Sequence, residues 1–255
     1  LAGTTFPIDR AYVARLLGFP RISKNSIDAV SDRDFVLEFL AASAILFVHL
    51  SRLAEEMILW SSEEFAFIEL PDRYCTGSSM MPQKKNPDVP ELVRGKTGRV
   101  FGHLQALLTV MKGLPLAYNR DLQEDKIPLF DTVDTVKASL GMMRELVRQI
   151  KIKKDRMRAA AQDGFMNATD LADYLVGRGV SFRSAHTLAG KVVRFCLEGR
   201  RRIEELTLRE LKRFSPKVDR DVYRYLTAEA AVQRRRAMGG TAVANVRRRL
   251  KELGV

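Results

Sequence analysis

The chain has 255 residues, of which 46% are hydrophobic and 29% are charged. This length and composition suit one or two domains with a proper core and exclude a chain that is disordered throughout. The formal net charge of +12 suggests an anionic partner, with nucleic acid as the first candidate. Its basic clusters lie in segments of helical pattern without interleaved aromatic residues, so we expect no nucleic-acid binding. These clusters are residues 151–158, 200–202, 234–236 and 247–249.

Only two cysteines are present, Cys75 and Cys196. They are too few for a disulfide framework, so we expect free thiols and a cytoplasmic protein. The most apolar stretch, residues 35–50, is interrupted by polar residues and is shorter than the roughly 20 residues of a bilayer span. It predicts a core helix and no membrane anchor. The chain opens on Leu1 without a targeting pattern, and we interpret this as a missing upstream portion.

Three long helical patterns occupy the first 150 residues. The first, residues 31–60, opens on a serine that can cap a helix and carries apolar residues at helical spacing. The second, residues 90–113, opens on a proline, whose fixed φ suits a first helical turn, and stops at a glycine. The third, residues 121–150, contains Pro128, which predicts a kink or a restart.

The helical segments after residue 155 are shorter, and Thr207 with Glu210 forms a predicted capping box. The predicted helices there are residues 168–175, 183–197, 207–214, 221–235 and 242–253. No stretch alternates with period two for long enough to form a sheet. The sequence therefore predicts an all-α protein, with a long-helix bundle over residues 1–154 and a small all-α C-terminal domain over residues 155–255.

A polar loop, residues 76–89, joins the first two long helices. Connections of this length without internal structure are often functional, although a merely exposed connection remains an alternative. Gly77 allows a backbone conformation that points neighbouring amide groups at one place. Two hydroxyls, an ammonium group and an amide accompany it, on Ser78, Ser79, Lys84 and Asn86. Together these donors suit a carboxylate.

The donors of this loop fit the removal of a proton from the carbon next to a carboxylate. That step increases the negative charge on the carboxyl group, and preorganised donors stabilise the product. A serine hydroxyl is a weak base, so it needs a lysine and amide dipoles in a site from which water is excluded. We therefore expect the loop to close over bound substrate.

The pattern Gly-Ser-Ser-x-Met-Pro-x-Lys-x-Asn, residues 77–86, resembles the signature of the fumarase/aspartase superfamily. Within that superfamily, the sequence Gln-Lys-Lys-Asn-Pro-Asp over residues 83–88 is similar to argininosuccinate lyases. Further stretches share the resemblance across nearly the whole chain: residues 2–10, 25–34, 118–126, 168–175 and 239–242.

The resemblance implies reversible cleavage of argininosuccinate into arginine and fumarate, with no metal or organic cofactor. It makes Ser78 the catalytic base, supported by Gly77. It places the carboxylate next to the reacting carbon on Lys84 and Asn86, and it includes Ser79 among the substrate-binding residues. The rest of the substrate would meet Tyr118, Gln123 and Lys126, of which Lys126 would hold a carboxylate that Lys84 does not. Glu91 matches a carboxylate that pairs with an active-site histidine.

That histidine is the main departure from the family pattern, because the family takes it from a segment N-terminal to this chain. We expect structural roles for His49 and His186, and His103 has no assigned role. The resemblance also implies a homotetramer in which each active site combines three subunits. We therefore expect the chain alone to be inactive, and its sequence does not identify the general acid.

Two other readings stay open from the sequence. The chain could belong to a superfamily member that acts on a different succinyl adduct. It could also be a structural protein without activity, as crystallin relatives of this family are. Retention of Ser78, Lys84, Asn86 and Gln123 argues against the structural role, which gains nothing from such a polar loop.

Overall fold

The computed structural model describes residues 1–255 and divides them into two compact units, Leu1–Ile152 and Lys153–Val255. Helices dominate both units, and the strands are two-residue pairs. β1 (Ile68–Glu69) pairs antiparallel with β4 (Lys151–Ile152), at the end of the first unit. The all-α class predicted from the sequence is confirmed.

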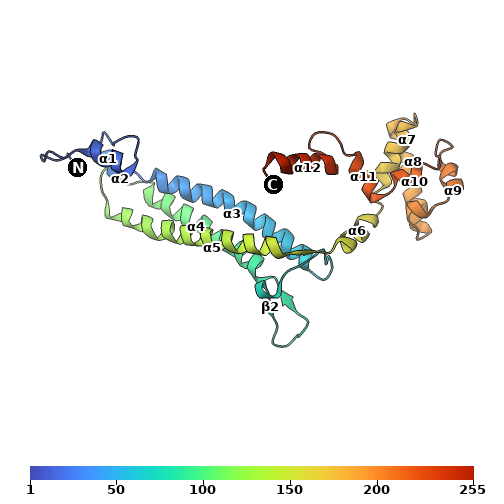
Figure 1. Ribbon diagram of the computed structural model, residues 1–255, viewed down its shortest axis with the longest axis horizontal. Coiled ribbons are helices and arrows are strands. Elements are labelled where there is room, and N and C mark those ends of the chain that lie inside the picture. Colours follow the sequence, from blue (N-terminus) through green and yellow to red (C-terminus); the bar gives the residue numbers. More distant parts are fainter. The chain divides into compact units, whose positions relative to one another are not determined.

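The first unit is built on three long helices that lie side by side and alternate in direction along the chain (Figure 1). They are α3 (Asp34–Ser61), α4 (Asp88–Met111) and α5 (Lys126–Gln149). Two short helices without buried residues precede them, α1 (Arg10–Leu17) and α2 (Ser26–Ser31). The 3₁₀ turns η1 (Asp72–Tyr74) and η2 (Arg120–Asp125) lie in the connections.

The core of the first unit forms where the apolar stripes of these helices meet. On α3, Leu40 and Phe47 are fully buried, as are Val100 and Leu107 on α4. By length and composition alone α3 could also cross a membrane, but the core helix of a soluble protein passes the same test. Its stripe packs on α4, as expected for a core helix.

The starts of the long helices differ from the predictions. Ser31 does not cap the first long helix, because it ends α2 and its hydroxyl donates to the carbonyl oxygen of Asp28. The carboxylate of Asp32 instead accepts from the backbone N–H of Asp34, at 2.7 Å. The second long helix begins at Asp88, before the proline that the sequence places first. This is possible because the amide groups of the first helical turn need no intrahelical partner.

The predicted restart near Pro128 is confirmed. η2 gives way to α5 at Lys126, so the proline falls in the first turn of a new α-helix. A proline there costs no intrahelical hydrogen bond, whereas the same residue inside one continuous helix would remove one.

The second unit consists of short helices, and its core centres on α7 (Ala168–Gly177) and α8 (Phe182–Glu198). The others are α6 (Lys154–Gln162), α9 (Leu208–Phe214), α10 (Val222–Tyr225), α11 (Ala228–Arg234) and α12 (Val243–Glu252), with the 3₁₀ turn η3 (Ile203–Glu205). The predicted single helix over residues 221–235 is wrong. It breaks before Thr227, whose hydroxyl accepts from the backbone N–H of Ala230 and so caps α11.

The predicted capping box at the start of α9 is confirmed. The Thr207 hydroxyl accepts from the Glu210 N–H at 3.3 Å, and the Glu210 carboxylate accepts from the Thr207 N–H at 2.8 Å. The hydrogen bond from Arg201, followed by those from Thr207, lowers the pKa of Glu210 to about 2. The box is therefore ionised and complete at neutral pH.

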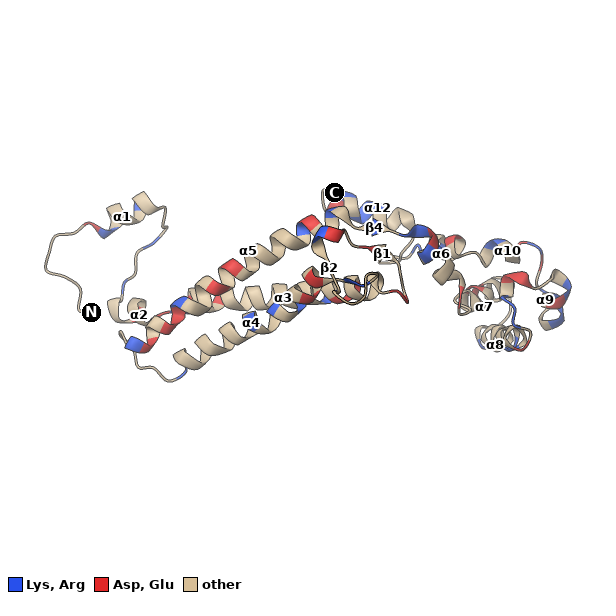
Figure 2. Cartoon of the chain, turned by 90° about the horizontal axis from the view of Figure 1, so that it is seen from below, with Lys and Arg blue, Asp and Glu red and all other residues tan.

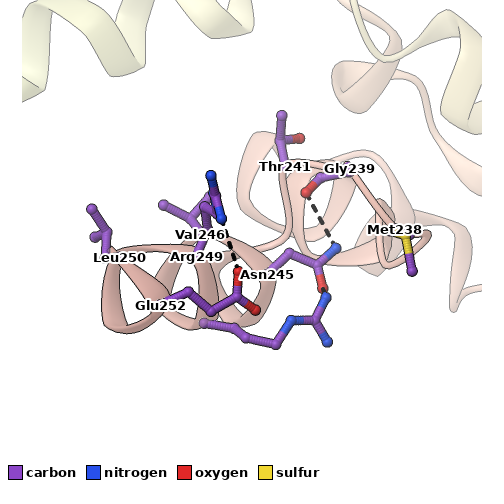
Figure 3. A pocket seen from close by; sticks show the side chains of 10 residues that line it. Met238, Gly239, Thr241, Asn245, Val246, Arg249, Leu250 and Glu252 are labelled. Atoms are coloured by element: carbon purple, nitrogen blue, oxygen red, sulfur yellow. Dashed lines mark hydrogen bonds and ion pairs between the residues drawn. The ribbon is translucent and has the colours of Figure 1, made fainter. Parts of the chain in front are cut away.

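The loop between α11 and α12 is held from the inside by Asn245 (Figure 3). Its side-chain amide donates to the carbonyl oxygens of Ala237, at 2.9 Å, and Gly240, at 3.2 Å. The loop folds so tightly that a Cβ at Gly240 would lie 2.2 Å from the carbonyl oxygen of Arg235. Only glycine fits at this position.

We expect Gly240→Ala to destabilise the second unit, because the new methyl group would force the loop away from Asn245. The expected loss is about 1–3 kcal/mol, the range for local backbone strain, and thermal unfolding followed by circular dichroism measures it. Gly190→Ala on α8 is the control, since a Cβ there meets nothing within 4 Å and helix propensity favours alanine. Equal melting temperatures for the two variants would contradict the tight turn.

Candidate active site

The predicted catalytic loop forms a hairpin between α3 and α4. β2 (Thr76–Gly77) pairs antiparallel with β3 (Lys85–Asn86), with Gly77 opposite Lys85. Ser78 and Lys84 are therefore the next residues on the two sides of the hairpin. The Asn86 side-chain amide donates to the Thr76 hydroxyl at 3.3 Å. The fold thus gathers the expected base and the expected carboxylate ligands, Lys84 and Asn86, on one small element.

The oxygen of Ser78 accepts two backbone hydrogen bonds inside the hairpin. The donors are the N–H groups of Met80 and Met81, each at 3.2 Å from Oγ. Hydrogen bonds donated to an oxygen favour its deprotonated form. This arrangement supplies the amide dipoles that a serine base requires.

Gly77 was expected to allow a special backbone conformation that points amide groups at one place, and the hairpin does not have that conformation at Gly77. Its φ lies outside the left-handed region, and a Cβ there would lie 3.8 Å from the Lys84 carbonyl oxygen, an ordinary contact. The amide groups that converge belong to Met80 and Met81, later in the hairpin. The turn geometry at Ser78 therefore does not depend on backbone freedom at Gly77.

Lys85 fastens the base of the hairpin to the turn before it. Its ammonium group donates to the carbonyl oxygen of Leu70 and lies 2.6 Å from a carboxylate oxygen of Asp72. This hydrogen bond lowers the pKa of Asp72 and raises that of Lys85, so both stay charged at neutral pH. Side chains alternate along a strand, which directs Lys85 away from the face of its neighbours Lys84 and Asn86. The position of Lys85 between Lys84 and Asn86 was therefore the sequence signal that Lys85 has a role different from theirs.

The remaining expected substrate ligands form a second group, at and after the connection from α4 to α5. The Gln123 side-chain amide donates to the Tyr118 hydroxyl at 3.2 Å. Lys126, the first residue of α5, pairs with Asp125. All three expected ligands are exposed, so they are free to meet a ligand.

Asp125 is the buried centre of this second group. Its carboxylate accepts from the guanidinium group of Arg33 and from the ammonium group of Lys126. Burial works against its charge, but the hydrogen bonds from Lys126 and Arg33 outweigh burial and hold the pKa of Asp125 below its usual value. Local sequence pattern does not reveal a contact between residues 92 positions apart, so no role for Arg33 or Asp125 could be predicted.

The two groups lie at opposite ends of the bundle (Figure 1). α4 separates them, and its 24 residues span about 36 Å at the usual rise of an α-helix. Glu91 is exposed in the first turn of α4, at the hairpin end. Residues of both groups in one chain therefore cannot contact a single small substrate.

The three histidines do not complete either group. His49 and His186 are exposed. His103 on α4 lies 2.6 Å from the carboxylate of Asp131 on α5, which also accepts from Arg99. Burial opposes ionisation of Asp131, but hydrogen bonds from Arg99 and His103 lower its pKa. This cluster ties α4 to α5.

Comparison with known protein families places matches in both units. Residues 1–102 match the family described as Lyase. Residues 165–233 match the family described as Argininosuccinate lyase C-terminal. The hairpin with the candidate base lies within the first match, and the core helices of the second unit lie within the other.

Among similar curated proteins is an argininosuccinate lyase from Syntrophotalea carbinolica, 63% identical over 242 residues, or 95% of this chain and 52% of the relative. Another, from Geobacter sulfurreducens, is 59% identical over 255 residues, or 100% of this chain and 56% of the relative. The chain thus spans about half the length of the curated relatives it matches.

A solved structure of an EDDS lyase variant with bound fumarate has the same fold, with a TM-score of 0.83 at 29% sequence identity. The match covers 98% of this chain and 52% of that protein. The arrangement of helices found here therefore also occurs in a lyase that holds a dicarboxylate.

Proposed function

The chain belongs to the argininosuccinate lyase family, and from this we propose that it supplies part of the active site of an enzyme that cleaves argininosuccinate reversibly into arginine and fumarate. The observation that carries the proposal is the hairpin, in which Ser78 Oγ accepts two amide hydrogen bonds and Lys84 and Asn86 lie close by along the chain. The proposed reaction uses neither a metal nor an organic cofactor. Two free thiols support a reducing compartment, and we propose the cytoplasm.

In the proposed reaction, deprotonated Ser78 removes a proton from the carbon next to a substrate carboxylate. Lys84 and Asn86 stabilise the charge that this carboxylate gains, and Ser79 adds a hydroxyl donor beside the base. The electron pair left on carbon then forms the carbon–carbon double bond of fumarate. The bond to the guanidino nitrogen breaks, and arginine leaves after that nitrogen takes a proton from a general acid. Tyr118, Gln123 and Lys126 bind the rest of the substrate, and Glu91 supports the histidine that a further segment contributes.

We propose a homotetramer, because one copy of the chain holds its two groups of site residues too far apart for one substrate. Apolar side chains left exposed along the long helices support this assembly: Phe35, Ile45, Val48 and Leu53 on α3, Leu92, Phe101 and Leu108 on α4, and Ile127, Phe130, Leu140 and Val147 on α5. We propose no nucleic-acid partner, since Lys and Arg are interspersed with Asp and Glu along α5 and form no continuous basic stripe there (Figure 2).

The decisive experiment joins this chain to the part of the Geobacter sulfurreducens relative that lies outside the matched region. We expect the chimera to cleave argininosuccinate, measured as fumarate absorbance together with released arginine. The chain without that part should show at least about a thousandfold less turnover, because a site without its proton donor and part of its ligands loses several catalytic contributions together.

The outcomes separate the competing roles. A folded chimera that releases no arginine would contradict the lyase assignment and favour a structural protein of this fold. Turnover by the 255-residue chain near that of the chimera would contradict the shared site. Circular dichroism checks that both proteins are helical.

A further inference from the structure

The buried carboxylate of Asp125 joins three elements of the first unit. It lies at the end of η2, its neighbour Lys126 begins α5, and its partner Arg33 directly precedes α3. Its side chain is 4% exposed, that of Arg33 is 15% exposed and that of Lys126 is 57% exposed. Of these three charged groups, Lys126 is therefore the one that reaches solvent.

Hydrogen bonds link Arg33, Asp125 and Lys126 in a chain that begins at backbone carbonyl oxygens and ends at the exposed ammonium group. Arg33 is fixed by the carbonyl oxygens of Val30, at 3.2 Å, and Asp32, at 2.6 Å. Its Nε donates to one oxygen of Asp125, and the ammonium group of Lys126 donates to the other. An ammonium group has three N–H donors, so Lys126 keeps two for a ligand. The group as a whole carries one positive charge, which suits a single carboxylate.

We propose that Asp125 is a positioning residue, which holds the ammonium group of Lys126 where the substrate's second carboxylate binds and is itself held by Arg33. This inference rests on the proposed function, in which Lys126 is a substrate ligand. Asp125 touches no substrate. Without its charge, Lys126 and Arg33 would face each other as two unshielded cations, and the flexible lysine would turn away.

The proposal predicts a change in binding without a change in chemistry. Lys126 holds the succinyl carboxylate that does not gain charge when the proton is removed, so it contacts ground state and transition state alike. In the complete enzyme, Asp125→Asn should raise KM for argininosuccinate by about tenfold to a hundredfold and leave kcat within about threefold. A merely structural role would lower kcat or the amount of folded enzyme at constant KM.

A double-mutant cycle tests whether Asp125 acts through Lys126. Lys126→Met alone should raise KM, and adding Asp125→Asn should raise it little further. Asp170→Asn is the matched control, because Asp170 is also a buried carboxylate, 3% exposed, between two guanidinium groups, those of Arg234 and Arg235. It lies in the second unit and should change melting temperature without changing KM.

A KM effect of Asp125→Asn that persists undiminished in the Lys126→Met background would overturn the proposal, as would an equal KM effect from Asp170→Asn. If Asp125→Asn does not fold, Arg33→Lys loosens the same group more mildly and is read in the same cycle. The unsubstituted enzyme decides the proposed function separately, by release of arginine. Calorimetric affinity for fumarate needs no turnover, so a weaker affinity in Asp125→Asn supports the positioning role and an unchanged affinity overturns it.

Discussion

Ser78→Ala should lower kcat about a thousandfold, within the range for loss of a general base, with a smaller change in KM. The substitution removes the oxygen that the N–H groups of Met80 and Met81 stabilise. Steady-state turnover of argininosuccinate by the complete enzyme measures the effect. A variant that keeps more than about a tenth of the wild-type turnover would exclude Ser78 as the base.

The hydroxyl of Ser78 also has a local structural role, which needs a matched control. Ser181 has a similar one at the start of α8, where its Oγ accepts from the Ser184 N–H at 3.3 Å. Ser181→Ala therefore loses the same kind of hydrogen bond away from the site. We expect it to lower the melting temperature slightly and to leave kcat unchanged. This distinguishes the loss of a catalytic base from the loss of a local hydrogen bond to the backbone.

Residues close together in sequence made the hairpin predictable. The candidate base and the candidate carboxylate ligands fall within residues 77–86, so any compact turn brings them together. Periodicity likewise located the long helices, because their apolar stripes repeat over many turns. The end of a helix depends on one or two side chains, and here the sequence misplaced it: Ser31 ends α2, and α3 follows Arg33, whose side chain makes no capping hydrogen bond.

Contacts between distant residues were not predictable from local pattern. Nothing around Asp125 indicates that it is buried, because η2 is otherwise rich in exposed polar residues. Its burial follows from the meeting of Arg33 with the start of α5, which only the packed bundle creates. The break before Thr227 is similar, since the helical pattern continues through it and a single hydroxyl starts a new helix.

Mixing two impaired variants of the complete enzyme should restore activity at low substrate concentration. The hairpin and the second group lie at opposite ends of α4, so a working site must combine the hairpin of one copy with the second group of another. Ser78→Ala destroys the first and Lys126→Met impairs the second. When equal amounts of the two variants assemble at random into a symmetric oligomer, each site has an even chance of an intact hairpin and an even chance of an intact second group. About a quarter of the sites therefore receive both intact.

We therefore expect a mixture of Ser78→Ala and Lys126→Met, assembled together from unfolded chains, to reach about a quarter of the wild-type turnover at low substrate. Size-exclusion chromatography checks that the oligomers match the wild type. Ser78→Ala mixed with Asn86→Ala is the control, because both substitutions lie in the hairpin and every hairpin then carries a defect. If the turnover of the first mixture does not exceed that of this control, the hairpin and the second group of one copy must serve the same site. The two would then have to come together in the active enzyme, although α4 holds them apart here.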